Sequence, residues 1–227
     1  MSLKHTIRDA LSPYPGLFIP FYRLLAPARN RELLIGPGTQ IVIEGYARSA
    51  NTFSVVAFEK AQGRPVKIAH HLHAEAQVLD GVRRGIPVIV LIRNPVDAIR
   101  SLKVAFPWAN DNRMIRRYIA FYRAVERVKD RVVVSEFKRT TADFGSIIAA
   151  VNAKFGTDFG LFETSDEAVE GVFSSIDTIN RSREGAQDLI ARPADHKDKA
   201  KETTTLDFDP ALLAEAERLY AVLTTAL

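Results

Sequence analysis

Short apolar runs and longer amphipathic segments alternate along the chain from Gln40 to Gly156. The runs are continuous and mostly β-branched, as in strands buried on both faces, whereas the longer segments have apolar residues at helical spacing. Strands are expected at residues 40–44, 66–71, 87–92 and 131–137, and helices at 52–61, 74–84, 95–106, 111–129 and 141–155. This alternation predicts an α/β fold with three α/β/α layers around a mostly parallel central sheet.

The two ends of the chain have different patterns. Residues 1–38 are interrupted by Pro and Gly, which predicts irregular structure around a short helix. Beyond Gly160 the chain is more polar, and residues 180–202 predict a mobile basic loop. The pattern at residues 210–223 predicts a final helix. At 227 residues, the chain is expected to form a single domain spanning residues 1–227.

Composition and charge narrow the class of protein. The formal net charge is +4 and the isoelectric point is about 9.4, which favours an anionic partner such as a nucleotide, a nucleic acid or a membrane surface. The sequence has no cysteine, no apolar run of about 18 residues and no signal-peptide pattern. We therefore expect a cytoplasmic protein without a disulfide, a thiolate metal site or a transmembrane segment.

The loop after the first predicted strand has the layout of a phosphate-binding loop without its lysine. A Walker A loop is Gly, four residues, then Gly-Lys-Ser/Thr. Gly45 and Thr52 match the ends of that pattern, but Ala50 replaces the second Gly and Asn51 replaces the Lys. Arg48 supplies a cation earlier in the loop. The alternative is a plain strand-to-helix turn with a surface arginine.

Such a loop still suits an anion less charged than a nucleoside triphosphate. The backbone N–H groups of Ser49, Ala50, Asn51 and Thr52 are expected at the positive end of the helix dipole. Arg48 can donate two hydrogen bonds to phosphate or sulfate oxygens.

A second candidate anion site follows the strand at residues 87–92. Arg93 stands at its carboxyl end, and Ser101 lies eight residues further on, about two helical turns into the next helix. Ligands of open α/β sheets bind at the carboxyl ends of the strands, so Arg93 and the loop after Gly45 share one edge. The alternative is a helix-start arginine with a solvent-facing serine.

Three stretches, GYARSANTF, AHHL and LIRNPVDAIRSL, together resemble the sulfotransferases that use 3′-phosphoadenosine 5′-phosphosulfate (PAPS). The first is similar to that family's 5′-phosphosulfate loop, whose basic residue precedes the Ser, as Arg48 does here. The third is similar to its 3′-phosphate motif, an Arg with Pro two residues later and Ser eight later, here Arg93, Pro95 and Ser101. The stretch VVVSEF and the closing helix are also similar to family elements. The resemblance covers residues 40–160 and the tail.

The resemblance implies a P-loop-containing nucleotide-binding fold, PAPS as donor and no metal ion. It also implies a histidine base, because the family often carries Lys-Thr-His-Leu after the second strand. A histidine with a near-neutral pKa suits removal of the acceptor's proton. His71, followed by Leu72, is the first choice, and His73 is the second.

Several positions depart from the family pattern or leave alternatives open. Ala69 stands where the family has its Lys, and His70 or His73 is a candidate replacement. Glu75 is a further candidate base, since some members use a carboxylate. The structural alternative for this histidine cluster is a polar strand end whose side chains form hydrogen bonds with nearby groups.

The late part of the chain matches the family weakly. Arg183 and Gly185 match two residues of the family's Arg-Lys-Gly, which closes over the 3′-phosphate, and Arg181 is an alternative ligand. Ser135 stands where the family often has a Tyr against the adenine, so Phe53 is a candidate stacking ring instead. Trp108 is a candidate for the wall of the acceptor pocket.

The sequence thus favours an enzyme that moves a sulfuryl group from PAPS to a hydroxyl or amine by in-line transfer. The acceptor is expected to be a small molecule, a glycan or a lipid, and not a nucleic acid. Two alternatives remain open, a P-loop kinase-like phosphotransferase and a nucleotide-binding protein that has lost catalysis.

Overall fold

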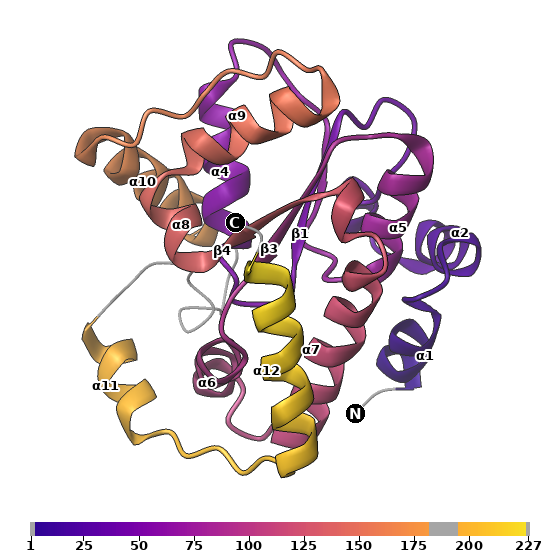
Figure 1. Ribbon diagram of the computed structural model, residues 1–227, viewed down its shortest axis with the longest axis vertical. Helices are drawn as coiled ribbons and strands as arrows, with labels where there is room; N and C mark the ends of the chain where they lie inside the picture. Colours follow the sequence, from indigo (N-terminus) through magenta and orange to yellow (C-terminus); the bar gives the residue numbers. More distant parts are fainter. Residues whose placement is uncertain (1–2, 182–194, 226–227) are drawn as a thin grey trace.

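A sheet of parallel strands lies at the centre of the computed structural model, which describes residues 3–181 and 195–225 (Figure 1). In the described ranges the sheet has four strands in the order β2-β1-β3-β4, and every neighbouring pair is parallel. The elements in chain order are α1 (Leu3–Leu11), α2 (Pro15–Leu25), α3 (Ala28–Arg31), β1 (Ile41–Gly45), α4 (Asn51–Ala61), β2 (Ile68–His70), α5 (Glu75–Arg84), β3 (Val88–Ile92), α6 (Pro95–Ala105), α7 (Asp111–Glu126), the 3-10 helix η1 (Lys129–Arg131), β4 (Val133–Glu136), α8 (Phe137–Ala142), α9 (Phe144–Phe155), α10 (Asp166–Arg181), α11 (Asp195–Thr203) and α12 (Pro210–Thr224).

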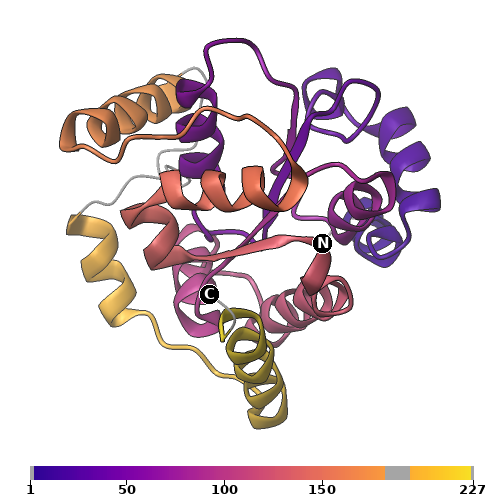
Figure 2. The same ribbon diagram turned by 45° about the horizontal axis from the view of Figure 1, so that its top comes forward.

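The strands are apolar throughout because helices cover both faces of the sheet. Val42 and Val90 point toward the core shared with α5, α7 and α12, whereas Ile43 and Leu91 point toward the core shared with α4, α9 and α10. This alternation is the period of two expected of a strand. Figures 1 and 2 show the resulting layers of helices, sheet and helices. The predicted α/β/α architecture with a parallel sheet is therefore confirmed.

The amino-terminal segment differs from its prediction. Residues 1–38 were expected to be irregular around a short helix, but α1, α2 and α3 lie within them. Pro15 stands in the first turn of α2, where its missing N–H costs no hydrogen bond. The helix then packs Phe18 and Ile19 into the core beside α5. The prolines taken as interruptions are therefore compatible with helices held by tertiary packing.

The helix expected at residues 141–155 is two helices. Asp143 lies between them, and its side chain accepts a hydrogen bond from the Ser146 N–H at 3.1 Å, so it caps the start of α9. The shorter α8 begins directly after β4, where the Glu136 carboxylate accepts from the N–H groups of Lys138 and Arg139. The end of α9 at Gly156 is as predicted, with Gly156 at a φ of 65°.

The final helix is observed as predicted, and part of the segment predicted as a basic loop is helical. The predicted helix at residues 210–223 is observed as α12, which begins after Asp209 and packs along α7. Residues 195–203, predicted as part of a basic loop, form α11. In the described ranges no helix is long and apolar enough to cross a bilayer.

Candidate functional site

The loops after β1, β2 and β3 meet at one edge of the sheet. β1 lies between β2 and β3, so the carboxyl ends at Gly45, His70 and Ile92 are neighbours. This is the edge at which open parallel sheets bind ligands. The parallel order therefore places the phosphate-loop candidate, the histidine cluster and Arg93 side by side.

The loop between β1 and α4 contains a row of backbone donors without acceptors in the described ranges. Arg48 and Ala50 have φ angles of 70° and 69°, in the left-handed region that non-glycine residues rarely adopt. Alternation of handed conformations turns successive N–H groups toward a common centre, as in anion-binding nests. In the described ranges no acceptor is bonded to the N–H groups of Ser49, Ala50, Asn51 and Thr52. The loop thus has the geometry of an anion cradle.

Asn51, which replaces the Walker lysine, braces this loop from inside. Its Nδ2 donates to the Tyr46 carbonyl at 3.0 Å, while its buried Oδ1 has no hydrogen-bond partner in the described ranges. The side chain is turned back toward the strand and carries no charge. The lysine ammonium that a Walker loop places on the β- and γ-phosphates is thus absent from this position.

Tyr122 of α7 ties the loop to the sheet, a role that was not predicted from the sequence. Its hydroxyl donates to the Leu91 carbonyl at 2.7 Å and accepts from the Tyr46 N–H at 3.2 Å. The Ser49 hydroxyl lies 3.5 Å away. Burial raises the pKa of Tyr122, so its hydroxyl keeps its proton and its donor role. A buried tyrosine on an amphipathic helix gives no signal beyond core packing.

Arg48, Ser101 and Arg93 are brought together above the loop. Arg48 Nε donates to Ser101 Oγ at 3.0 Å, and Arg93 Nη1 donates to the Arg48 carbonyl at 3.2 Å. Burial, and secondly the charge of Arg93, lower the pKa of Arg48. Because two guanidinium groups this close repel each other, an anion bound between them relieves the repulsion. From the sequence, Arg48 and the pair Arg93 and Ser101 were predicted to form two separate anion sites. Their contacts join them into one cluster.

An aromatic ring beside Arg93 was missed by the sequence reasoning. The Arg93 guanidinium lies over the ring of Phe137, 4.1 Å from its centroid, and the Tyr118 hydroxyl donates to the Arg93 carbonyl at 2.8 Å. Cation–π stacking restricts the guanidinium to one orientation. The available signal was a Phe at the end of the fourth predicted strand, at the same edge of the sheet.

The three histidines form a tight turn after β2. His71 and His73 have φ angles of 57° and 49°. The Nε2 of His71 lies 3.0 Å from the Thr52 hydroxyl in the first turn of α4, and its Nδ1 contacts Nδ1 of His70. His73 Nδ1 donates to the Gly45 carbonyl at 2.7 Å. The histidine turn therefore lies against both ends of the anion loop.

Buried Glu44 holds this turn from below. Its carboxylate accepts from the N–H groups of Leu72 at 2.8 Å and His73 at 3.1 Å, and from Nε2 of Gln77 at 2.9 Å. Burial raises the pKa of Glu44 to about 7, against the opposing effect of these hydrogen bonds. Burial also lowers the pKa of His73 to about 4. His73 is thus neutral at physiological pH and a weak proton acceptor.

Other residues singled out from the sequence make structural contacts, are exposed, or lie outside the described ranges. Glu75 is buried and accepts from the Ser12 hydroxyl and from Arg117, so its carboxylate joins the link between α1 and α2 to α7. Phe53 is buried among Phe144, Phe162 and Phe173, which overturns its suggested role against adenine.

The remaining positions are placed as follows. Ser135 is buried, with its hydroxyl 2.6 Å from that of Thr140. Trp108 is exposed, and its ring contacts that of Phe106. Arg181 is the last residue of α10, and Arg183 and Gly185 lie outside the described residues. No three His, Asp or Glu side chains in the described ranges are grouped as metal ligands.

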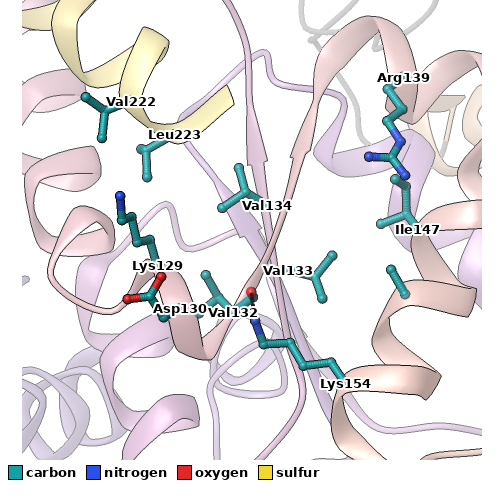
Figure 3. Close-up of a pocket in the computed structure, with 11 residues that line it drawn as sticks. Lys129, Asp130, Val132, Val133, Val134, Arg139, Ile147, Lys154, Val222 and Leu223 are labelled. Atoms are coloured by element: carbon teal, nitrogen blue, oxygen red, sulfur yellow. Dashed lines mark hydrogen bonds between the residues drawn. The ribbon is translucent and has the colours of Figure 1, made fainter. Parts of the chain in front are cut away.

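A hollow of about 360 Å³ lies elsewhere, along the outer edge of β4 between α9 and α12 (Figure 3). Val132, Val133 and Val134 form its floor, and none of its lining residues belongs to the loops after β1, β2 or β3. Lys154 Nζ donates to the Val132 carbonyl at 2.9 Å. β4 is an edge strand in the described sheet, and a lysine beside the start of an edge strand disfavours pairing with another chain.

Comparisons with known proteins add little to this geometry. Neither a scan against protein-family models nor a search of curated proteins finds a match. Among solved structures, mouse sulfotransferase SULT7A1 complexed with PAP gives a TM-score of 0.44 at 13% sequence identity, covering 84% of this chain and 85% of that chain. Because similarity at this level does not assign an activity, we argue function from the residues of the chain itself.

Proposed function

We propose that the chain is a PAPS-dependent sulfotransferase that transfers a sulfuryl group to a hydroxyl or amine. The observation that carries this proposal is the joining of Arg48, Ser101 and Arg93 next to a loop of unpaired backbone N–H groups. Two arginines and a row of amides match a nucleotide that carries anionic groups at both its 5′ and 3′ positions. The acceptor belongs to the small molecules, glycans or lipids.

The donor set suits this nucleotide better than ATP with magnesium. The N–H groups of residues 49–52 and the Arg48 guanidinium would hold the 5′-phosphosulfate, and Arg93 with Ser101 would hold the 3′-phosphate. Asn51 leaves the loop without the lysine of a nucleoside-triphosphate site. When bound, PAPS supplies an activated sulfuryl group with phosphate as the leaving group. Arg48 then stabilises negative charge that develops on that phosphate.

We assign the removal of the acceptor's proton to the imidazole of His71. Its Nε2 contacts Thr52 in the first turn of α4, beside the amides that would hold the phosphosulfate. His73 is the second choice, because a base with a pKa near 4 accepts a proton poorly at neutral pH. Arg183 and Gly185 are retained as additional ligands of the 3′-phosphate.

One observation favours a second candidate, a nucleotide-binding protein without turnover. Ala69 is buried in β2 where the resemblance calls for a lysine, so one cation that would stabilise the transferring group is missing there. Nucleotide binding without sulfuryl transfer would follow from that loss. A measurement must therefore separate binding from transfer.

The test is a thermal-shift titration with 3′-phosphoadenosine 5′-phosphate (PAP), compared with ATP plus magnesium. A ligand of the native state raises the melting temperature, by an amount equivalent to about 2.7 kcal/mol at one hundred times its Kd. We expect PAP to raise it without metal and ATP to have little effect. Arg93→Ala should abolish the PAP shift, while Arg64→Ala, on an exposed loop, should leave it intact.

A second variant separates the base from the binding site. His71→Asn should keep the PAP shift and lose sulfuryl transfer from labelled PAPS to acceptors found by screening, by about a hundredfold or more. A preference for ATP with magnesium would support the kinase-like reading instead. Absence of any shift with either nucleotide would overturn nucleotide binding altogether.

A further inference from the structure

Exposed apolar side chains gather on one helix far along the chain from the anion loop. Of the seven large hydrophobic side chains exposed in the described ranges, four lie between Tyr14 and Leu25. Leu24 is 80% exposed and Leu25 65%, and Tyr14 and Leu17 are each more than half exposed. With half-buried Phe21 they follow the spacing i, i+3, i+7, i+10 and i+11, so they form a stripe on one face of α2.

Rotation of α2 would not bury this stripe without exposing other apolar side chains, because the helix is already anchored in the core. Phe18 is fully buried and Ile19 nearly so, and both belong to the core that includes α5. The Phe18 ring stacks on Tyr22 at 5.3 Å. Figures 1 and 2 show α2 at the periphery of the molecule, with α5 between it and the sheet. The stripe therefore faces away from the protein.

The same segment carries only positive charge. Between Tyr14 and Arg31 there are three arginines, Arg23, Arg29 and Arg31, and the first acidic residue is exposed Glu32 at the end of α3. All three are exposed, and none forms a salt bridge with another described residue. An apolar stripe beside arginines without salt bridges matches a lipid surface, whose acyl chains are apolar and whose headgroups can be anionic.

We propose that α2 and α3 dock this protein on an anionic lipid surface, with the stripe from Tyr14 to Leu25 inserted among the acyl chains. At 11 residues α2 is about 16 Å long, too short to span a bilayer and suited to lying in its interface. Anionic headgroups neutralise the three arginines, whereas a second copy docked on the same face brings two sets of arginines together. This inference goes beyond the proposed function and does not depend on it.

Docking also has a consequence for access to the histidine turn. Arg8 of α1 donates to the Leu72 carbonyl, and Ser12, between α1 and α2, donates to Glu75. Arg8 thus joins α1, the helix that precedes α2, to the turn that carries His71 and His73. The bilayer would therefore lie on the side of the molecule from which α1 contacts that turn.

The test is co-sedimentation of the full chain with vesicles of phosphatidylcholine alone and of phosphatidylcholine with about one third phosphatidylserine. We expect binding to the anionic vesicles and an at least tenfold weaker partition onto the neutral ones, or at high salt. Leu24→Ser with Leu25→Ser should weaken partition onto anionic vesicles by about tenfold or more. Arg29→Gln with Arg31→Gln should weaken it by a similar factor.

Leu161→Ser is the matched control, because Leu161 is 54% exposed and lies between α9 and α10. It should bind anionic vesicles as the wild type does, and all variants should keep the wild-type melting temperature. Equal sedimentation of the Leu24/Leu25 variant and the wild type would overturn the proposal. So would a dimer in sedimentation velocity that needs Leu24 and Leu25, since a second copy would then cover the stripe.

Discussion

Glu44 is a carboxyl group placed where ionisation is costly and yet structurally useful. It lies at zero exposure under the histidine turn, and its oxygens accept from the N–H groups of Leu72 and His73. These two residues are adjacent, and His71 and His73 in the same turn adopt left-handed backbone conformations. The carboxylate thus accepts the hydrogen bonds that water would otherwise accept from this strained turn, which carries the proposed base.

Titration of Glu44 should appear in the pH dependence of stability. Its folded pKa, about 7, lies above its usual value of 4.5, so between these values the native state binds more protons than the unfolded state. Its contribution to stability is therefore lost as pH rises from about 5 to about 8, by up to roughly 3 kcal/mol. Urea unfolding of the wild type and Glu44→Gln at both pH values checks this.

The wild type should lose stability relative to Glu44→Gln as pH rises across that window. His73 acts in the opposite direction, because its lowered pKa removes stability as pH falls from about 6.5 to about 4. The effect of His73 is confined to pH values below about 6.5, so the part of the window above that value reports Glu44. A difference between wild type and variant that stays constant with pH would contradict the assignment.

At the scale of elements, glycine at the end of β1 is required by the neighbouring strand. A Cβ at Gly45 would lie 2.3 Å from the Leu91 carbonyl oxygen and 2.9 Å from the Leu91 Cβ. Real Cβ atoms do not approach that closely, so any side chain here would push β1 away from β3. The first glycine of the loop pattern is thus explained by strand packing, whatever the loop binds.

Gly45→Ala should therefore destabilise the fold by about 3 kcal/mol through overpacking. Gly63→Ala is the control, because Gly63 is exposed after α4 and a Cβ there meets nothing within 4 Å. Its effect should stay within about 0.5 kcal/mol. Chemical denaturation of both variants measures the contrast, and equal stabilities would show that β1 shifts without cost.

At the scale of the whole molecule, α12 returns from the end of the chain to close the core over α7. Ala216, Leu219 and Leu223 are buried in that contact. On the outer side, Arg218 bonds Glu126 of α7 at 2.7 Å and Glu215 at 2.8 Å. Apolar burial is expected to supply most of the energy of this docking, because exposed ion pairs are screened by water and salt.

Adjacent residues of α12 provide the test. Leu219→Ala should cost about 2–5 kcal/mol, since it leaves a cavity in a closed core. Arg218→Ala should change the melting temperature little, and less still at high salt. Differential scanning calorimetry of both variants checks that the leucine variant loses more stability than the arginine variant. A larger loss for the arginine variant would show that the surface network, and not the core, holds α12.

Much of the architecture was predictable from local pattern. The buried strands have continuous apolar runs, and Gly85 and Gly156 end α5 and α9 in the left-handed conformation that glycine adopts without strain. Only one short helix was predicted in the first 38 residues, because local signals at Pro15 and Pro20 favour interruption and packing onto α5 supports α2. The division at Asp143 was missed for the same kind of reason, since a cap signal lay inside an apolar run.

The sequence by itself determined the alternation of strands and helices from β1 to β4 and the residue types at the carboxyl edge of the sheet, because burial and turn chemistry act over a few residues. Only the tertiary structure decided which of these residues meet. It joined Arg48 to Ser101 across 53 positions, tied the loop to Tyr122, and enclosed Phe53 in the core. Such contacts depend on how helices cross the sheet, and a linear pattern holds no information about side chains that meet from distant elements.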